Sequence, residues 1–160
     1  MAQGNEIVLS GEPRGRFYEG IIASGETPKP GTVMQIQAAV EPIGGRLTWE
    51  MFDAGADGDQ RLIAVLLPDQ LQGKMATDAY AAGDRCFLYI PLPGDELNML
   101  VSNISGTSDS FAIGDLLMVN DGDGELIATT GSPESESFIV METVAALTAD
   151  TLVHCMFTGY

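Results

Sequence analysis

Apolar residues in this chain gather in short runs that glycine and proline interrupt every few residues. Few stretches keep a 3.6-residue apolar period for three turns, so the pattern gives little support for helices. The runs have the length of strands and lie at 33–40, 61–67, 86–92, 97–101, 115–119, 125–129, 137–141 and 151–157. Many short strands with turn residues between them predict an all-β protein, a compact β-sandwich or barrel-like domain of short strands and hairpins.

Two kinds of strand can be told apart by their patterns. Residues 33–40 alternate, with apolar side chains on one face and Gln35 and Gln37 on the other, which predicts a half-buried strand. The runs at 61–67 and 86–92 are apolar on both faces, so we expect them to be covered by a second layer or by another subunit. Pro91, inside the second of these runs, indicates a sheet edge or a bulge.

A weak internal repeat precedes three of the expected strands. The segments PKPGTVMQI (28–36), YAAGDRCFLYI (80–90) and FAIGDLLMV (111–119) each place a glycine just before an apolar run. A glycine at such a position predicts a tight turn with positive φ that directs the next strand into the sheet. The spacing is too irregular for a solenoid or a propeller.

The first 30 residues differ from the rest of the chain in composition. Gly, Pro, Ser and charged residues surround one island formed by Phe17-Tyr18 and Ile21-Ile22. We therefore expect an extended N-terminal arm over 1–30 and a single β domain over 31–160, with the island docking the arm onto a partner. The alternative is a flexible tail without a partner, since chain termini are commonly disordered.

Charge is strongly unbalanced. The chain has 23 acidic and 7 basic residues, for a net charge of −16, and every lysine and arginine lies at or before Arg85. Such a surface repels phosphate, so we expect no nucleic-acid partner and no anionic membrane partner. No apolar stretch approaches the roughly 20 residues that span a bilayer, and the first residues lack a secretory signal, which predicts synthesis in the cytoplasm. In that compartment Cys86 and Cys155 are expected to be buried free thiols.

Catalytic motifs are missing from the sequence. The single histidine, His154, sits in TLVHCMF (151–157), where it shares a strand face with Leu152 and Met156 while Cys155 points to the opposite face. A pairing of His154 with Cys86 across strands is the less favoured alternative to a packing or interface role. Cys and His are too few for a structural zinc site, and no phosphate-binding glycine loop is present. We expect no catalytic residues, no metal and no cofactor.

Calcium is the one site hypothesis with some support, at DAGADGD (53–59) and NDGDGE (120–125). Both segments lack the glutamate that closes a helix-loop-helix calcium loop, and both separate expected strands. Asp-Gly between apolar runs favours a hairpin turn, in which Leu116–Val119 pairs with Leu126–Thr129. Calcium binding at either loop stays open as the alternative.

Taken together, PKPGTVMQI (28–36), residues 67–101, residues 112–129 and the final TLVHCMFTGY resemble the capsid decoration, or cement, proteins of tailed bacteriophages. The resemblance implies a non-enzymatic homotrimer on the outer surface of the capsid that clamps neighbouring copies of the major capsid protein. It implies a capsid contact through Arg14, Arg16, Phe17, Tyr18, Ile21 and Ile22. It also implies a subunit interface through Leu152, His154 and Met156, with the anionic second half facing outward.

Two other classes remain as alternatives. One is a different virion or surface β module, such as a tail or receptor-binding domain. The other is a small β-barrel enzyme acting on a sugar or nucleotide, in which His154 and the carboxylates of 53–59 would be required for turnover.

Overall fold

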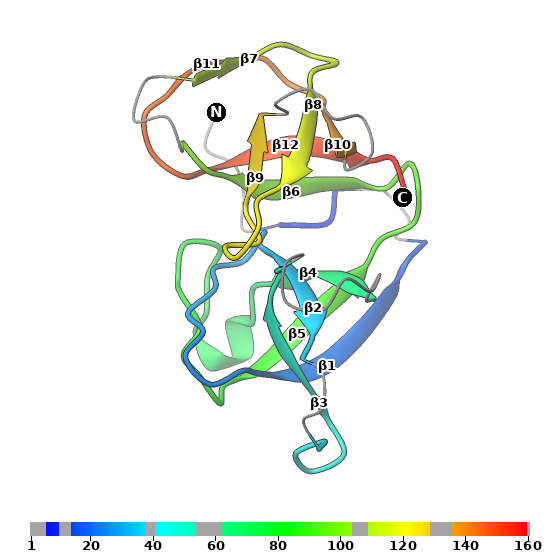
Figure 1. Cartoon of the computed structure of the whole chain (residues 1–160), viewed down its shortest axis with the longest axis vertical. Coiled ribbons are helices and arrows are strands. Elements are labelled where there is room, and N and C mark those ends of the chain that lie inside the picture. Colours follow the sequence, from blue (N-terminus) through cyan, green and yellow to red (C-terminus); the bar gives the residue numbers. More distant parts are fainter. Residues whose placement is uncertain are drawn as a thin grey trace.

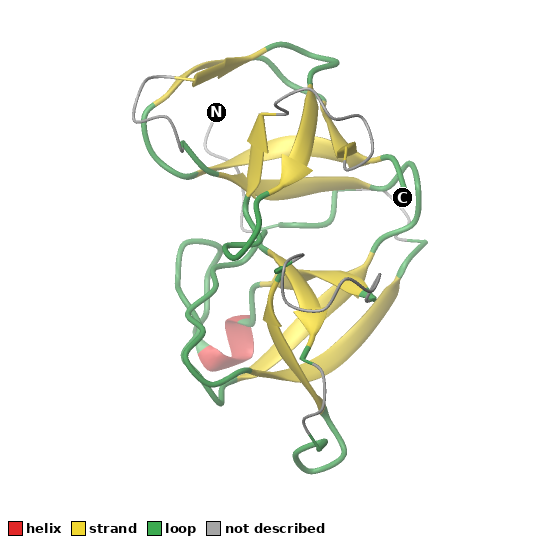
Figure 2. Cartoon of the chain, viewed as in Figure 1, coloured by secondary structure: helices red, strands yellow, loops and turns green. Residues whose placement is uncertain are grey.

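The structure is a computed structural model that describes residues 6–9, 14–37, 41–53, 62–103, 109–128 and 136–159. The all-β prediction is confirmed, because the described chain consists of strands joined by turns and one 3-10 turn (Figure 2). In chain order the elements are β1 (Arg16–Ile22), β2 (Val33–Ile36), β3 (Leu47–Met51), β4 (Ile63–Leu67), η1 (Gln70–Gln72), β5 (Arg85–Ile90), β6 (Glu96–Val101), β7 (Asp109–Phe111), β8 (Leu116–Val119), β9 (Leu126–Ala128), β10 (Glu136–Val140), β11 (Val144–Leu147) and β12 (Thr151–Phe157). Within the described segments, no helix has the length and hydrophobicity needed to cross a membrane.

The strands form two small closed barrels, one above the other in Figure 1. Barrel 1, the lower one, has the strand order β1-β3-β2-β4-β5. Barrel 2, the upper one, has the order β10-β12-β6-β9-β8, and β11 and β7 form a separate two-stranded ribbon. Closure removes most of the free sheet edges that a short-stranded protein would otherwise expose.

The two barrels have the same connectivity. In barrel 1 the first strand, β1, is parallel to the third, β3, and the other neighbouring pairs are antiparallel. In barrel 2 the corresponding strands are β6, β8, β9, β10 and β12, and β6 is likewise parallel to β9. The chain therefore builds one topology twice, with the β7–β11 ribbon added to the second copy.

Stacking of the barrels explains the strands that are apolar on both faces. Along β4, Ala64 and Leu66 belong to the cluster that fills barrel 1, while Ile63 and Val65 belong to a cluster shared with barrel 2. That shared cluster also holds Leu97 and other residues of β6, β8, β10 and β12. Of the two covers expected for these strands, the described structure shows a second layer formed by the same chain. Pro91 lies just beyond the end of β5.

The hairpin predicted around 120–125 is confirmed. β8 and β9 pair antiparallel, with Val119 opposite Leu126, and the Asn120 N–H donates to the Glu125 carbonyl across the turn. The loop also reaches barrel 1, where the Gly122 N–H donates to the Phe52 carbonyl and the Gly124 carbonyl accepts from Val33 N–H. Figure 1 shows this yellow loop at the junction, so it links the barrels.

The predicted glycine turns are also confirmed. Gly31, Gly83 and Gly114 have φ of +89°, +83° and +97°, and each lies two residues before a strand. In the turns ending at Asp84 and Asp115, the aspartate carboxylate accepts the N–H of the residue three positions earlier at 2.9 Å and 2.8 Å. LPGD (92–95) forms the same turn before β6, where the Leu92 N–H donates to Asp95 Oδ2 at 2.8 Å.

The N-terminal arm needs correction for its described residues. Arg16–Ile22 is β1 of barrel 1 and pairs with β5 over its length, and Ile7 to Leu9 lie along β6 of barrel 2. The sequence did not indicate β1, because residues 1–30 are rich in charge and glycine and the first half of the strand, Arg16–Glu19, is exposed. Residues 1–5 and 10–13 lie outside the described structure.

The half-buried strand predicted at 33–40 is also corrected. Gln35 is 2% exposed, and its amide donates to Glu50 Oε1 at 3.0 Å and to the Asp53 carbonyl at 3.3 Å. A satisfied amide can be buried at modest cost, and the polar positions of the alternation therefore did not mark a solvent face. Residues 38–40 lie outside the described structure.

Candidate functional site

Four of the six predicted capsid-contact residues, Arg14, Arg16, Phe17 and Tyr18, lie on or beside the first half of β1. Arg16, Phe17 and Tyr18 are on the surface, and the side chains of Phe17 and Tyr18 are 56% and 38% exposed. Phe17 stacks against Tyr89 of β5, with 5.0 Å between ring centroids. A partly anchored aromatic ring with an exposed face is typical of protein contact surfaces.

The second half of β1 departs from this picture. Ile22 is 1% exposed and packs in the core of barrel 1, so its assignment to the capsid contact is corrected. Ile21 is half-buried. Alternation along β1 places the side chain of Ile22 inside the barrel, on the same face as Gly20. Gly20 packs against Trp49, and a Cβ added at Gly20 would lie 2.3 Å from the indole.

Arg14 holds the start of β1 against the segment that joins the barrels. Its Nε donates to Asp95 Oδ1 at 3.2 Å and its Nη2 to the Pro93 carbonyl at 2.7 Å. Asp95 is fully buried and also accepts the Tyr89 hydroxyl at 2.7 Å. Burial and this hydrogen bond to Asp95 raise the pKa of Tyr89 to about 12. The predicted contact residue Arg14 therefore has a structural role as well as an exposed side chain.

Arg16 differs from the other described arginines. Arg14, Arg46 and Arg85 each form an ion pair with an aspartate or glutamate, whereas Arg16 forms none with any described residue. Arg61 lies outside the described segments. An arginine without an internal counterion is suited to bind a carboxylate of a partner.

Further exposed apolar residues lie near β1 in barrel 1. Ile43 and Leu47 are 57% and 38% exposed, and Leu47 is paired with Gly20 of β1. Between them Arg46 Nε lies 2.9 Å from Glu19 Oε2. Sequence reasoning missed these two residues, because EPIGGRLTW reads as a turn and gives no sign that β3 begins at Leu47.

The predicted subunit-interface residues share one face of β12, as expected. Leu152, His154 and Met156 are half-buried, while the alternating residues Val153, Cys155 and Phe157 are in the core. His154 Nε2 lies 3.0 Å from Glu96 Oε2, and its backbone N–H donates to Glu142 Oε1. Part of this face is thus covered by the chain itself.

Neither cysteine is placed for catalysis with His154. Cys86 is in the interior of barrel 1 and Cys155 in the core shared by the barrels, and both are free. Burial raises the pKa of each thiol to about 12. The alternative pairing of His154 with Cys86 is not formed, because the two residues belong to different barrels.

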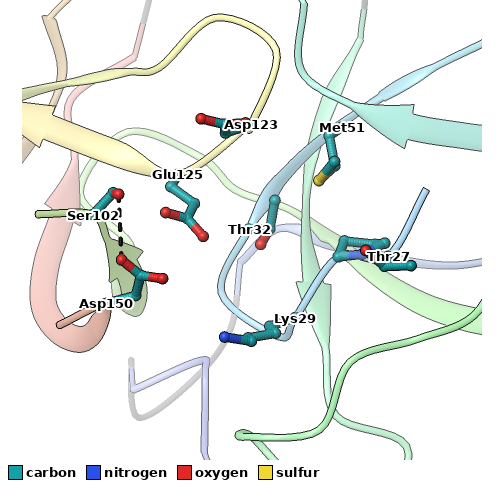
Figure 3. A pocket seen from close by; sticks show the side chains of 9 residues that line it. Thr27, Lys29, Thr32, Met51, Ser102, Asp123, Glu125 and Asp150 are labelled. Carbon is teal, nitrogen blue, oxygen red and sulfur yellow. Dashed lines mark hydrogen bonds between the residues drawn. The ribbon is translucent and has the colours of Figure 1, made fainter. Parts of the chain in front are cut away.

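A cavity of about 400 Å³ opens where the barrels meet. Figure 3 shows Lys29 from barrel 1 facing a cluster of Asp123, Glu125 and Asp150 from barrel 2. The pKa of Glu125 is raised, first by burial and then by Asp150 and Asp123, while Ser102 and Lys29 act in the opposite direction. The cavity is a polar junction between the barrels.

The structure describes all of one proposed calcium loop, 120–125, but only the first residue of the other, 53–59. In 120–125 the Asn120 side chain donates to Asp123 Oδ2 at 2.7 Å, as in a self-contained turn. Of 53–59 only Asp53 lies within the described residues. Across the residues that the structure describes, no group of three or more His, Cys, Asp or Glu side chains is placed to hold a metal ion.

Comparison with known proteins finds similarity at the level of the fold. No protein-family model matches the sequence, and no curated protein matches it either. Among solved structures, the chain is similar to the N base of head fiber gp8.5 of bacteriophage phi29, with a TM-score of 0.54 and 10% sequence identity. The similarity covers 90% of this chain and 94% of the phage chain. The two chains therefore share a fold over nearly their whole lengths.

Proposed function

We propose that this chain is a structural protein of a phage virion that binds the outer surface of the capsid and stabilises the expanded head by clamping neighbouring copies of the major capsid protein. The observation that carries the proposal is the fold shared with a phage head fiber base over 90% of the chain. A whole-length match supports a common architecture for proteins of the head surface, although fold alone does not determine function.

The distribution of charge supports the orientation of the protein on the shell. All seven cations belong to residues 14–85, and residues 86–160 hold eleven carboxylates and no lysine or arginine. Barrel 1 would therefore face the capsid and barrel 2 the solvent. A strongly anionic outer face keeps crowded particles apart and soluble. The same charge opposes a role in binding nucleic acid or an anionic membrane.

The chemistry of the described residues supports a non-enzymatic role. His154 is hydrogen-bonded to Glu96, and the thiols of Cys86 and Cys155 are buried and have raised pKa values. The mechanism proposed is thermodynamic linkage, in which a protein that binds only the assembled shell lowers the free energy of that shell. A homotrimer would place three copies of a modest contact on one site and multiply their effect through avidity.

A direct test mixes the purified protein with expanded heads that lack it and measures sedimentation of the protein with the heads. We expect saturable binding to expanded heads and none to unassembled capsid protein. Equal binding to both, or to neither, would contradict the proposal.

A second candidate is a base for another surface structure of the virion, such as a tail or receptor-binding module. It is favoured by the structural neighbour, which is itself the base of a head fiber. This candidate predicts that the protein binds heads without changing their stability to heat.

A further inference from the structure

The first strands of the two barrels have matching edges. β1 pairs with β3 only from Gly20 onward, and β6 pairs with β9 only at Val101. In both barrels the residue that follows the first strand donates an equivalent hydrogen bond to the third strand. In barrel 1 Ala23 N–H donates to the Trp49 carbonyl, and in barrel 2 Ser102 N–H donates to the Leu126 carbonyl. This correspondence places Phe17 at the position of Glu96 and Glu19 at the position of Asn98.

In barrel 2 an extended segment fills the remaining edge of the first strand. Leu9 N–H donates to the Glu96 carbonyl at 2.8 Å, and Asn98 N–H donates to the Ile7 carbonyl at 2.7 Å. Val8 forms an antiparallel bridge with Leu97 between these bonds. Ile7 is 2% exposed, so the segment completes both the sheet and the core.

In barrel 1 the matching edge has no such segment among the described residues. Ile22 N–H donates to Asp84 of the β5 side, so by alternation the backbone groups of Phe17 and Glu19 point away from β5 toward this edge. Among the described residues, no strand pairing or backbone hydrogen bond occupies it before Gly20. The side chains along it, Arg16 to Glu19, are all exposed.

We propose that the edge of β1 over Arg16–Glu19 receives an extended segment of a capsid subunit, which adds to barrel 1 as an antiparallel strand. The inference rests on the proposed function and specifies its contact. Glu19 N–H donates to a carbonyl of the incoming segment, and the Phe17 carbonyl accepts an N–H two residues further along that segment. A residue of the segment lies opposite Tyr18, as Val8 lies opposite Leu97.

The side chains define the chemistry of the incoming segment. Phe17 and Tyr18 offer exposed aromatic surface for an apolar residue, and Arg16, which has no ion pair with a described residue, offers a site for a carboxylate. Strand addition of this kind takes its affinity from main-chain hydrogen bonds and its specificity from such side chains. A second copy of this chain is a poor source, because its own apolar segment, Ile7 to Leu9, already fills barrel 2.

Hydrogen exchange at the Glu19 amide tests the inference directly. We expect this amide to exchange rapidly in the free protein and to be slowed by about tenfold or more when the protein is bound to expanded heads. Binding with unchanged exchange at Glu19 would overturn the strand addition while leaving the proposed function intact. Failure to bind heads at all would overturn both.

Three substitutions give an independent readout. Phe17→Lys and Arg16→Glu should each weaken binding to heads by about tenfold or more, because a lysine protects a sheet edge and a glutamate repels the expected carboxylate. Ile113→Lys is the control, since Ile113 is 65% exposed on barrel 2 and should bind as the parent does. Thermal unfolding checks that the variants fold. Equal binding by all three would contradict the inference.

Discussion

At the scale of single residues, Gly124 joins the two barrels. Its φ is +66°, and an added Cβ would lie 2.2 Å from the Val33 carbonyl oxygen. Gly124→Ala should lower the free energy of unfolding by about 3 kcal/mol, the sum of backbone strain and a backbone clash. Gly122→Ala in the same loop is the matched control, because its Cβ would meet nothing within 4 Å. Denaturant unfolding of both variants should show the smaller loss for Gly122→Ala; equal losses would contradict a tight junction at Gly124.

Glu125 makes the junction sensitive to pH. Its pKa is raised in the folded protein, chiefly by burial, so the ionised form costs stability once the pH exceeds the folded pKa. Glu125→Gln should therefore raise the melting temperature at pH values above the folded pKa, where the parent carboxylate is charged. The advantage should shrink as the pH falls through the folded pKa, because the parent then becomes neutral too. A gain that is independent of pH would show that the charge is not the cause.

The two cysteines report on whether the barrels stay closed. Both thiols are buried and have pKa values raised to about 12, so few thiolates form near neutral pH. A thiol-modifying reagent should react with neither Cys86 nor Cys155 in the folded protein and with both after denaturation. Rapid labelling of either residue before unfolding would indicate that its barrel opens.

At the scale of elements, the N-terminal segment is part of barrel 2. Ile7→Ala should cost about 3 kcal/mol of stability, as expected for a buried isoleucine. Val8→Ala should cost less, because Val8 is only partly buried. Thermal unfolding compares the two variants. A loss no larger for Ile7→Ala than for Val8→Ala would argue against a structural role of the segment.

The elements that the sequence predicted are those with a local signal. Asp-Gly between apolar runs identified the β8–β9 hairpin, and glycine before a run identified the turns at Gly31, Gly83 and Gly114. β1 was assigned to an arm because its first half is exposed and charged, and its pairing with β5 joins residues about 70 positions apart. β3, β7 and β11 were not predicted, since they lack alternation long enough to stand out.

At the scale of the whole molecule, the sequence predicted the class but not the duplication. Strands that are apolar on both faces indicated a cover, yet only the structure shows that a second barrel of the same topology provides it. Of the predicted contact residues, Arg16, Phe17 and Tyr18 come together on one exposed edge, whereas Ile22 is core. Exposure depends on partners distant in sequence, which periodicity within one strand does not reveal.

The unequal distribution of charge between the two barrels is a property of the assembled fold. The described lysines and arginines belong to barrel 1 and its loops, and the described strands of barrel 2 contain none. A protein with this distribution is expected to adopt one orientation on a shell rather than several. A bulky tag attached at Ile43 on barrel 1 or at Ile113 on barrel 2 tests this orientation, because both side chains are exposed. The tag should block binding to the shell only on the barrel that faces the shell.

The central claim is that the protein stabilises an expanded capsid from outside. The most direct measurement heats DNA-filled heads with and without the purified protein and follows the release of DNA with a dye. The account predicts that heads carrying the protein release DNA at a higher temperature, and that added protein restores this temperature to heads that lack it. Release at the same temperature, with the protein shown to be bound, would contradict the clamping role.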